Sequence, residues 1–348
     1  MAGEIRAIPR HVATQLAESD DELTVAASAI GAAAPRWVIM VGRGTSDHAA
    51  LYGRYLLEAQ LRLPVAMAAP SLTTVYHAPI RWTDGLVLAV SQSGRSPDVI
   101  AVVEAARAGG ATTLAITNDP RSPLADAAQL VLTCHAGEER AVAATKTYVA
   151  ELVALAALVA RLAPRSELAA GLERLPDVLG RCLERSVRWV ERMPAAAAFA
   201  RADRALVASR GYNLATAAEV ALKLKETAAI FAEAYSTADL LHGPIALAGP
   251  GIPLLALRPD GPMGERIDEG VGRAEAAGSP TFVVGGREVE PLAALNGSTA
   301  LALPLDLPEM LTPMALVLPG QLLAEAVAGR RGRNPDEPAG LRKVTLTR

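Results

Sequence analysis

The stretch Leu86-Val-Leu-Ala-Val-Ser-Gln-Ser-Gly-Arg-Ser-Pro-Asp98 carries the residue types that hold a small anion. It begins with an apolar run typical of a buried strand, and Ser96-Pro97 is typical of a helix N-cap followed by proline. Small residues between them let backbone N–H groups and the positive end of the helix face one ligand, and the side chains of Ser91, Gln92, Ser93 and Ser96 add donors. The pattern favours a phosphate site, although a plain strand-to-helix turn uses the same residues.

A second cluster consists of Glu219, Lys223 and Glu226, spaced i, i+4 and i+7 so that they share one helix face. Such spacing is most often a solvated Glu–Lys pair worth about a few tenths of a kcal/mol. Here the helix follows an Arg210-Gly211 turn after an expected strand, and ligands bind at the carboxyl ends of parallel strands. His242-Gly-Pro244, which holds an imidazole on a stiff turn, comes soon after. The sequence therefore favours an acid–base site.

The elements that must position these residues alternate between apolar strand-like runs and helical stretches, which predicts parallel sheets covered on both faces. The first expected series comprises strands at 36–41, 65–68, 86–90, 112–117 and 130–133, with helices at 47–58, 97–108 and 142–162. The second series comprises strands at 204–208, 253–257, 280–284 and 300–303, with a helix near 308–327. The remaining expected helical regions are one or two short helices in 4–34 and a charge-rich helical segment from 167 to about 201.

The two series look like copies of each other. The turns Val41–Ser46 and Ala208–Asn213 share an Arg-Gly pair and a capping Ser or Asn, and each leads into an Ala-rich helix, which predicts an internal duplication. We therefore expect four parts: an N-terminal helical segment, two α/β domains and an extended tail, with the bounds 1–34, 35–165, 166–329 and 330–348.

Composition excludes several classes of function. The 348 residues carry a net charge of −3 with 3% aromatics, which disfavours nucleic-acid binding. Only Cys134 and Cys182 are present, too few for a disulfide framework, so we expect a reducing, cytoplasmic setting. The histidines and cysteines lack ligand spacing, and we expect no metal site. The N-terminus lacks a signal region, and the longest apolar helical stretch, 152–160, is too short to span a bilayer.

Nucleotide binding and hydrolase chemistry fit less well. Gly42-Arg-Gly-Thr-Ser-Asp47 starts like a dinucleotide fingerprint, but Asp47 stands at the third glycine and the next strand ends without a ribose-binding acid. Neither Ser91 nor Ser93 lies in a Gly-x-Ser-x-Gly elbow.

Several motifs, in this order, resemble the paired sugar isomerase (SIS) domains of the glucosamine-6-phosphate synthase family. They are Ser91-Gln-Ser-Gly94, Val142-Ala-Ala-Thr-Lys146, Glu219…Lys223…Glu226, Ala232-Glu-Ala-Tyr235 and His242-Gly-Pro244. The resemblance covers nearly the whole chain. It implies two tandem flavodoxin-like domains, no cofactor, and a hexose 6-phosphate bound between the subunits of a homodimer.

The resemblance also implies a role for each matching residue. The turn at Gly44 and the side chains of Thr45, Ser46, Ser91, Gln92, Ser93 and Ser96 would hold the phosphate, and the backbone near Val142 and Ala143 would line the sugar site. Glu226 would move a proton between C1 and C2, and Lys223 with Glu219 would stabilise the enediol oxygen. His242 of the partner subunit would open the sugar ring, and the tail residue Lys343 would form a Schiff base with the ketose.

The chain departs from the family pattern at two arginines. Arg43 stands where the family often has Cys, and Arg95-Ser96 stands where it has Glu-Thr, so both arginines are expected to add positive charge beside the anion site. About thirty residues precede the first expected strand, which leaves no room for a glutaminase domain. We therefore expect deamination of glucosamine 6-phosphate to fructose 6-phosphate and ammonium.

Three other functions stay open at this point. The same scaffold suits a fructosamine-6-phosphate deglycase or another phosphosugar isomerase. A non-catalytic sugar-phosphate sensor would need the phosphate loop but would have no use for Glu226, His242 and Lys343 together.

Overall fold

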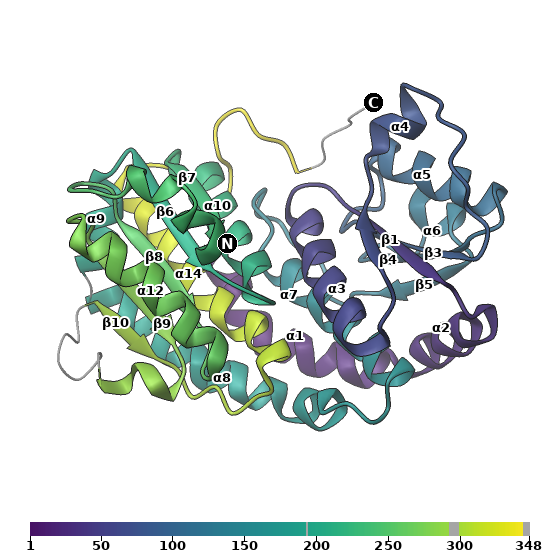
Figure 1. Ribbon diagram of the computed structural model, residues 1–348, viewed down its shortest axis with the longest axis horizontal. Helices are drawn as coiled ribbons and strands as arrows, with labels where there is room; N and C mark the ends of the chain where they lie inside the picture. The colour runs from purple at the N-terminus through teal and green to yellow at the C-terminus, as the bar shows by residue number, and fades with distance from the viewer. Residues whose placement is uncertain (193, 292–298, 344–348) are drawn as a thin grey trace. The chain divides into compact units, whose positions relative to one another are not determined.

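The computed structural model describes residues 1–192, 194–291 and 299–343, and these divide into two compact units, each built on one five-stranded sheet (Figure 1). The first unit comprises residues 10–139 and 146–173 with the described end of the chain from Arg342. The second unit comprises residues 1–9, 140–145 and 174–341. The predicted α/β class with two parallel sheets is confirmed.

The sheet of the first unit has the strand order β2-β1-β3-β4-β5, and all its pairs are parallel. Its strands in chain order are β1 (Trp37–Val41), β2 (Val65–Met67), β3 (Gly85–Val90), β4 (Thr112–Thr117) and β5 (Leu130–Thr133). All six residues of β3 are buried, because a central parallel strand has helices on both faces. The chain order changes direction between β1 and β3, and their carboxyl ends form the switch point at which such sheets bind ligands.

The helices of the first unit cover both faces of this sheet. They are α2 (Asp20–Ala33), α3 (Thr45–Leu61), α4 (Pro70–Thr74), α5 (Pro97–Ala108), α6 (Pro123–Ala127) and α7 (Lys146–Leu162). Helix α5 begins with Pro97 after the N-cap Ser96, as the sequence predicts. Helix α7 packs against α3 and is buried almost throughout.

The sheet of the second unit repeats the topology of the first. Its strands are β6 (Arg204–Ser209), β7 (Phe231–Ser236), β8 (Leu254–Arg258), β9 (Thr281–Gly285) and β10 (Ala300–Ala302). They lie in the order β7-β6-β8-β9-β10, all parallel, which matches the first sheet strand for strand. The predicted duplication and the flavodoxin-like strand order are therefore confirmed.

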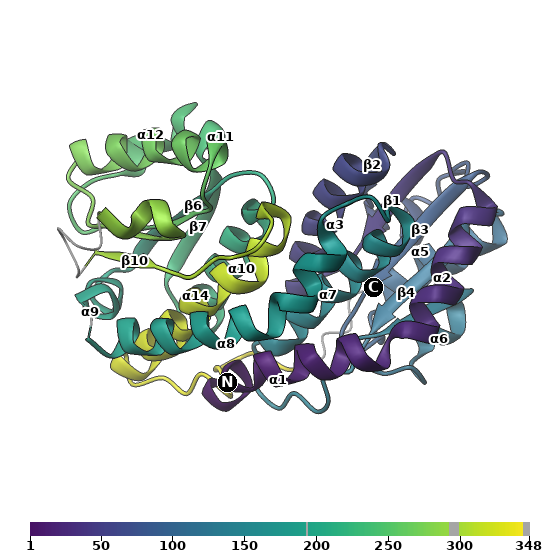
Figure 2. The same cartoon turned by 90° about the horizontal axis from the view of Figure 1, so that it is seen from below.

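The helices of the second unit are α9 (Pro194–Arg201), α10 (Asn213–Ala228), α11 (Thr237–Leu241), α12 (Pro262–Ala276), α14 (Thr312–Arg330) and the 3₁₀ helices η1 (Pro244–Leu247), η2 (Arg287–Val289) and η3 (Glu309–Leu311). In this unit, α10 packs against the sheet strands β6, β7 and β8 and against α14. Figure 2 shows α14 beside α10. A Cβ on Gly320 of α14 would lie 2.2 Å from Val220 Cγ2 of α10, so the absence of a side chain permits this close packing.

Two further helices, α1 (Ala2–Glu18) and α8 (Leu168–Arg192), each contain residues of both units. The helical segment expected from 167 to about 201 consists of the two helices α8 and α9. The helix expected from 142 begins only at Lys146, because residues 142–145 form a bend. Strand β7 and helix α12 were not predicted.

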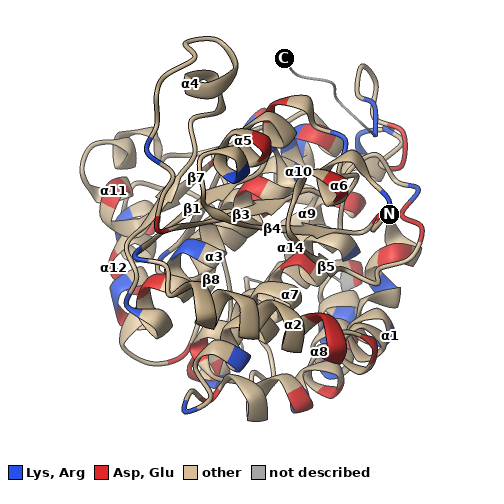
Figure 3. Cartoon of the chain, turned by 90° about the vertical axis from the view of Figure 1, so that its right-hand side faces the viewer, with Lys and Arg blue, Asp and Glu red and all other residues tan. Residues whose placement is uncertain are grey.

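One described helical segment, Glu309–Arg330, is long and apolar enough to cross a membrane by length and composition alone. Because 83% of its apolar window is buried inside the structure, it is the core helix of the second unit. The expectation that 152–160 is the longest apolar helical stretch is therefore wrong. Acidic and basic residues are interspersed along the helices in the view of Figure 3.

Candidate functional site

The loop that follows β3 is the first candidate site, and its backbone forms a tight turn. The Gly94 N–H donates to the carbonyl oxygen and to Oγ of Ser91, each at 3.2 Å, and the Arg95 N–H donates to Ser93 Oγ at 3.3 Å. The Gln92 carbonyl accepts from the Asn118 N–H at 3.1 Å, which fixes the loop to the end of β4. These bonds fix the backbone of the loop that leads into the N-terminus of α5.

Three backbone N–H donors in this loop have no partner among the described residues. No acceptor in the described part of the chain pairs with the backbone N–H of Gln92, Ser93 or Ser96, and the Ser96 hydroxyl makes no capping bond. Unpaired N–H groups at a helix N-terminus combine with the helix dipole to favour an anion. The predicted phosphate loop therefore has the donors that a phosphate requires.

Gly94 is required in this turn for two reasons. Its φ of +60° lies in the left-handed region, and a Cβ there would lie 2.0 Å from Ser122 Oγ. Ser122 itself caps α6 by accepting from the Ala125 N–H. The loop is thus packed against the next strand–helix turn.

The turn after β1 lies in the same unit, but its serine is already engaged. Ser46 is buried; its hydroxyl donates to Glu151 Oε1 of α7 at 2.7 Å, and its N–H donates to the Arg43 carbonyl at 3.1 Å. Gly44 is exposed with a φ of +55°, and Thr45 begins α3. The role of Thr45 and Ser46 in phosphate binding stays a prediction, and for Ser46 it would require the hydroxyl to change its partner.

The two arginines beside the loop are both paired with aspartates. Arg43 Nε donates to Asp98 Oδ2 at 2.6 Å, and Arg95 Nη2 lies 3.3 Å from Asp119 Oδ2. Each aspartate offsets part of the charge of its arginine. The expectation that Arg43 and Arg95 add positive charge beside the anion site stays a prediction.

The acid–base cluster on α10 is buried. Lys223 Nζ lies 2.6 Å from Glu226 Oε2 and 3.3 Å from Glu219 Oε1. The side chains of Glu219 and Lys223 are fully buried, whereas Glu226 is 25% exposed. The alternative of a solvated Glu–Lys helix face is excluded, since buried charged groups of this kind need partners and are rare.

The charge of Lys223 is maintained by its neighbours. Burial opposes the ammonium form, but the carboxylates of Glu219 and Glu226 outweigh it and raise the pKa of Lys223 above its ordinary value. The lysine is therefore a fixed cation one helical turn from a carboxylate that reaches the surface.

Three further predicted residues of the second unit, His242, Val142 and Ala143, lie outside α10. His242 is exposed at the C-terminus of α11, and its N–H donates to the Asp239 carbonyl at 3.1 Å. The Val142 N–H donates to the Asp336 carbonyl at 2.9 Å, and Ala143 is buried. The Val142 N–H is thus bonded to the C-terminal segment.

The tail lysine is held by a carboxylate that sequence reasoning missed. Lys343 Nζ lies 2.9 Å from Glu139 Oε2, and Glu139 also accepts from the N–H of Thr147 at 3.2 Å and its hydroxyl at 2.9 Å. Glu139 is fully buried and Lys343 is 25% exposed. The pair fixes the last described residue of the chain near the start of α7. Glu138-Glu139 after a strand was the available signal, but only the fold pairs it with the tail.

Other groups in the described chain offer no comparable chemistry. Burial, and then the carboxylates of Glu151, Glu22 and Glu139, raise the pKa of Cys134 well above its ordinary value, and burial raises the pKa of Cys182 to about 12. Both thiols are therefore poor nucleophiles.

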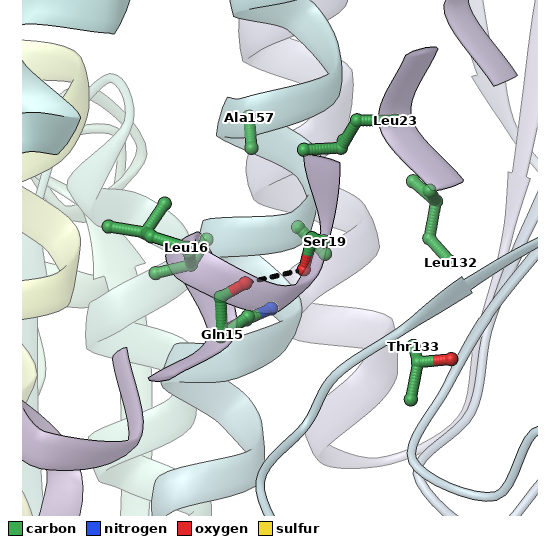
Figure 4. A pocket seen from close by; sticks show the side chains of 9 residues that line it. Gln15, Leu16, Ser19, Leu23, Leu132, Thr133 and Ala157 are labelled. Atoms are coloured by element: carbon green, nitrogen blue, oxygen red, sulfur yellow. Dashed lines mark hydrogen bonds between the residues drawn. The ribbon is translucent and has the colours of Figure 1, made fainter. Parts of the chain in front are cut away.

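Among the described residues, no group of three or more His, Cys, Asp and Glu side chains could hold a metal ion. Figure 4 shows a cavity of about 10 Å³ where Ser19 donates to the Gln15 carbonyl at 2.6 Å, too small for a sugar.

The sequence matches a family model described as the SIS domain at residues 33–161 and 198–294. The two matched ranges contain the two sheets, apart from β10. This agrees with the duplication seen in the strand order.

Relatives and solved structures agree with this match. The chain is 38% identical over 329 residues to the glutamine–fructose-6-phosphate aminotransferase (isomerizing) of Symbiobacterium thermophilum, covering 92% of the chain and 53% of the relative. A candidate phosphosugar isomerase from Silicibacter pomeroyi is 34% identical, with a TM-score of 0.84, 96% coverage of this chain and 98% of that one. The C-terminal domain of the Francisella tularensis glucosamine-fructose-6-phosphate aminotransferase has the same fold, with a TM-score of 0.87, 24% identity and 96% coverage of each chain. The chain spans about half the length of the curated relatives it matches.

Proposed function

The chain belongs to the SIS domain family, and from this premise we propose that it is a phosphosugar aldose–ketose isomerase that deaminates glucosamine 6-phosphate to fructose 6-phosphate and ammonium. The observation that carries the proposal is the buried Glu219–Lys223–Glu226 cluster. A protein that only binds sugar phosphates has no need to bury a lysine between two carboxylates, since that arrangement is costly unless the charges are used.

The reaction requires removal of a weakly acidic proton from C2 and its return to C1, which converts the C2 amine to an imine. Water then adds at C2, and the C–N bond breaks to release ammonium and the ketose. In this proposal Glu226 accepts the proton from C2 and delivers it to C1, because its carboxylate is the member of the cluster that reaches the surface. The ammonium group of Lys223 stabilises the negative charge that develops on the enediol oxygen. Glu219 positions Lys223 from the other side.

The phosphate of the substrate is assigned to the loop of Ser91, Gln92, Ser93 and Ser96, whose unpaired N–H groups support this role. His242 is assigned the opening of the sugar ring. Lys343 is assigned Schiff-base formation with the ketose, for which it must leave Glu139 and lose a proton, since only a neutral amine attacks a carbonyl. No metal or cofactor enters the proposal, and we expect the protein to act in the cytoplasm.

A substrate panel tests this function. Glucosamine 6-phosphate, other hexosamine phosphates and fructosamine 6-phosphates are assayed for release of ammonium and of ketose. Release of both from glucosamine 6-phosphate supports the deaminase. Release of an amine only from fructosamine phosphates would identify a deglycase, aldose–ketose conversion without ammonium would identify a plain isomerase, and binding without turnover would identify a sensor.

The phosphate assignment predicts that the protein discriminates strongly against the free sugar. Glucosamine 6-phosphate should bind at least about tenfold more tightly than glucosamine in calorimetry, because each charge-assisted contact contributes about 1.5–3 kcal/mol. The change Ser93→Ala should weaken the binding of glucosamine 6-phosphate and leave the melting temperature of the protein unchanged. Ser71→Ala on α4 is the control. Equal affinities for the two sugars would contradict the assignment.

The homodimer with shared sites is also open to a direct test. Neither His242→Ala nor Glu226→Gln subunits should be active alone, and a mixture that exchanges subunits should regain activity if the partner's histidine completes each site. Subunit exchange is followed by mixing tagged and untagged chains. Exchange without recovered activity would show that His242 acts within its own chain or has no catalytic role.

A further inference from the structure

The pair Arg43–Asp98 joins the two loops of the switch point in the first unit. Arg43 lies in the turn after β1, and Asp98 lies in the first turn of α5, two residues after Ser96. Arg43 Nε donates to Asp98 Oδ2 at 2.6 Å, and Nη2 contacts the same oxygen. One guanidinium thus holds the turn after β1 against the helix whose N-terminus carries the phosphate loop.

The two partners differ sharply in burial. The side chain of Asp98 is 3% exposed, whereas that of Arg43 is 50% exposed. Among the described residues, Asp98 accepts one further hydrogen bond, from the N–H of its neighbour Val99 at 3.0 Å. Arg43 is therefore the cation that balances a buried carboxylate directly beside the proposed anion site.

An unbalanced carboxylate at this position would act on a bound phosphate. Two like charges a few ångströms apart repel each other strongly where water is excluded. The repulsion is weak only where water and salt screen it. Water screens Asp98 poorly because the residue is buried.

From these contacts we propose that Arg43 is a positioning residue for phosphate binding: it neutralises the buried carboxylate of Asp98 and clamps the turn after β1 to the start of α5. The proposal rests on the proposed function in that the anion is taken to be the phosphate of a sugar phosphate. It explains why an arginine stands at this place, since a neutral residue would leave Asp98 unpaired.

The chain offers a matched control in Arg54, which lies on α3 of the same unit and outside the proposed site. Arg54 pairs with Glu58 at 3.3 Å, and both partners are exposed. Loss of an exposed pair changes little, because solvent screens the glutamate that remains.

The test is calorimetric titration with two probes, inorganic phosphate and glucosamine 6-phosphate. Arg43→Gln should lower the affinity for both probes by about tenfold or more. The double variant Arg43→Gln/Asp98→Asn should recover to within about threefold of the wild type, because it removes the carboxylate that the arginine balances. Arg54→Gln should bind both probes within about twofold of the wild type. In turnover, Arg43→Gln should raise KM and leave kcat unchanged, a separation that general damage to the fold would not give.

Several results would overturn the proposal. These are unchanged binding in Arg43→Gln, a double variant that binds no better than the single one, or equal losses of affinity in Arg43→Gln and Arg54→Gln. If Arg43→Gln does not fold, Arg43→Lys keeps the charge and should bind both probes within about threefold of the wild type, and a larger loss would contradict charge balance.

The failure of this proposal can be told from the failure of the proposed function. The predicted pattern with inorganic phosphate, in a protein that turns over no amino sugar phosphate, would support Arg43 and reject the activity. Normal turnover by the wild type, with unchanged binding of both probes in Arg43→Gln, would support the activity and reject the role of Arg43. A wild-type protein that binds neither probe would reject both.

Discussion

Replacing Glu226 by glutamine is expected to lower kcat by about 10²–10⁴ while the dissociation constant for the sugar phosphate changes little. Glutamine keeps the size of the side chain and can still accept a hydrogen bond from Lys223, which lies 2.6 Å from the carboxylate. It cannot take a proton from carbon. Steady-state kinetics and calorimetry on the same preparation separate the two effects.

Glu233 provides the control for this substitution. It lies in β7 of the same unit, is partly exposed and pairs with Lys225 at 3.3 Å. Glu233→Gln should leave both kcat and affinity close to those of the wild type. A Glu226→Gln variant with near-normal turnover would show that another group is the base.

Replacing Lys223 by methionine is expected to lower the free energy of unfolding by about 3–5 kcal/mol, because it leaves the fully buried carboxylate of Glu219 without its cation. Urea denaturation measures the loss. The double variant Glu219→Gln/Lys223→Met should recover much of it, because the fully buried carboxylate is removed together with its cation and the remaining carboxylate, Glu226, is 25% exposed.

Lys225 lies on the same helix and gives the matched comparison. It is exposed and pairs with Glu233, so Lys225→Met should cost less than about 1 kcal/mol. Equal losses in Lys223→Met and Lys225→Met would contradict the description of Lys223 as a buried, balanced cation.

The same cluster predicts how stability depends on pH. The pKa of Lys223 is raised in the folded protein, so its contribution is complete below the ordinary value of 10.5 and is lost as the pH rises through the higher folded-state value. The wild type should therefore lose stability in this alkaline range relative to Glu219→Gln/Lys223→Met. Parallel stability curves for the two proteins above pH 10 would contradict the assignment.

Sequence patterns predicted most of the sheet because buried parallel strands are continuous apolar runs. Leu86–Val90 and Thr112–Thr117 were identified in this way, and β3 begins one residue earlier than expected. Strand β7 was missed because Phe231–Ser236 contains Glu233 and is mostly half-buried at the edge of its sheet. Edge strands lack the uniform apolar signal on which the prediction depends.

Spacing alone also identified the α10 cluster, but not its environment. The i, i+4, i+7 pattern placed three side chains on one face, and it could not tell a solvated face from a buried one. The burial depends on tertiary packing, in which α10 contacts β6, β7, β8 and α14, and α14 comes about a hundred residues later in the chain. Gly320 permits that contact, and its importance is not visible in the sequence of α14.

The partners of the predicted site residues were the least predictable part. Glu139, Asp98 and Glu151 bond to Lys343, Arg43 and Ser46 over long separations in sequence. Glu151 gave the best available signal, as a single acid within an otherwise apolar helix. A carboxylate at such a position needs a buried donor.

Solvent exchange tests the central claim most directly, because it detects proton transfer at carbon whatever the fate of the amine. Wild-type protein is incubated with glucosamine 6-phosphate in deuterated water, and the sugar phosphates are analysed by mass spectrometry and NMR. We expect deuterium at C1 of the ketose or at C2 of recovered substrate, and none with Glu226→Gln. A wild-type protein that binds the sugar phosphate but incorporates no deuterium, or equal incorporation in the variant, would contradict the account.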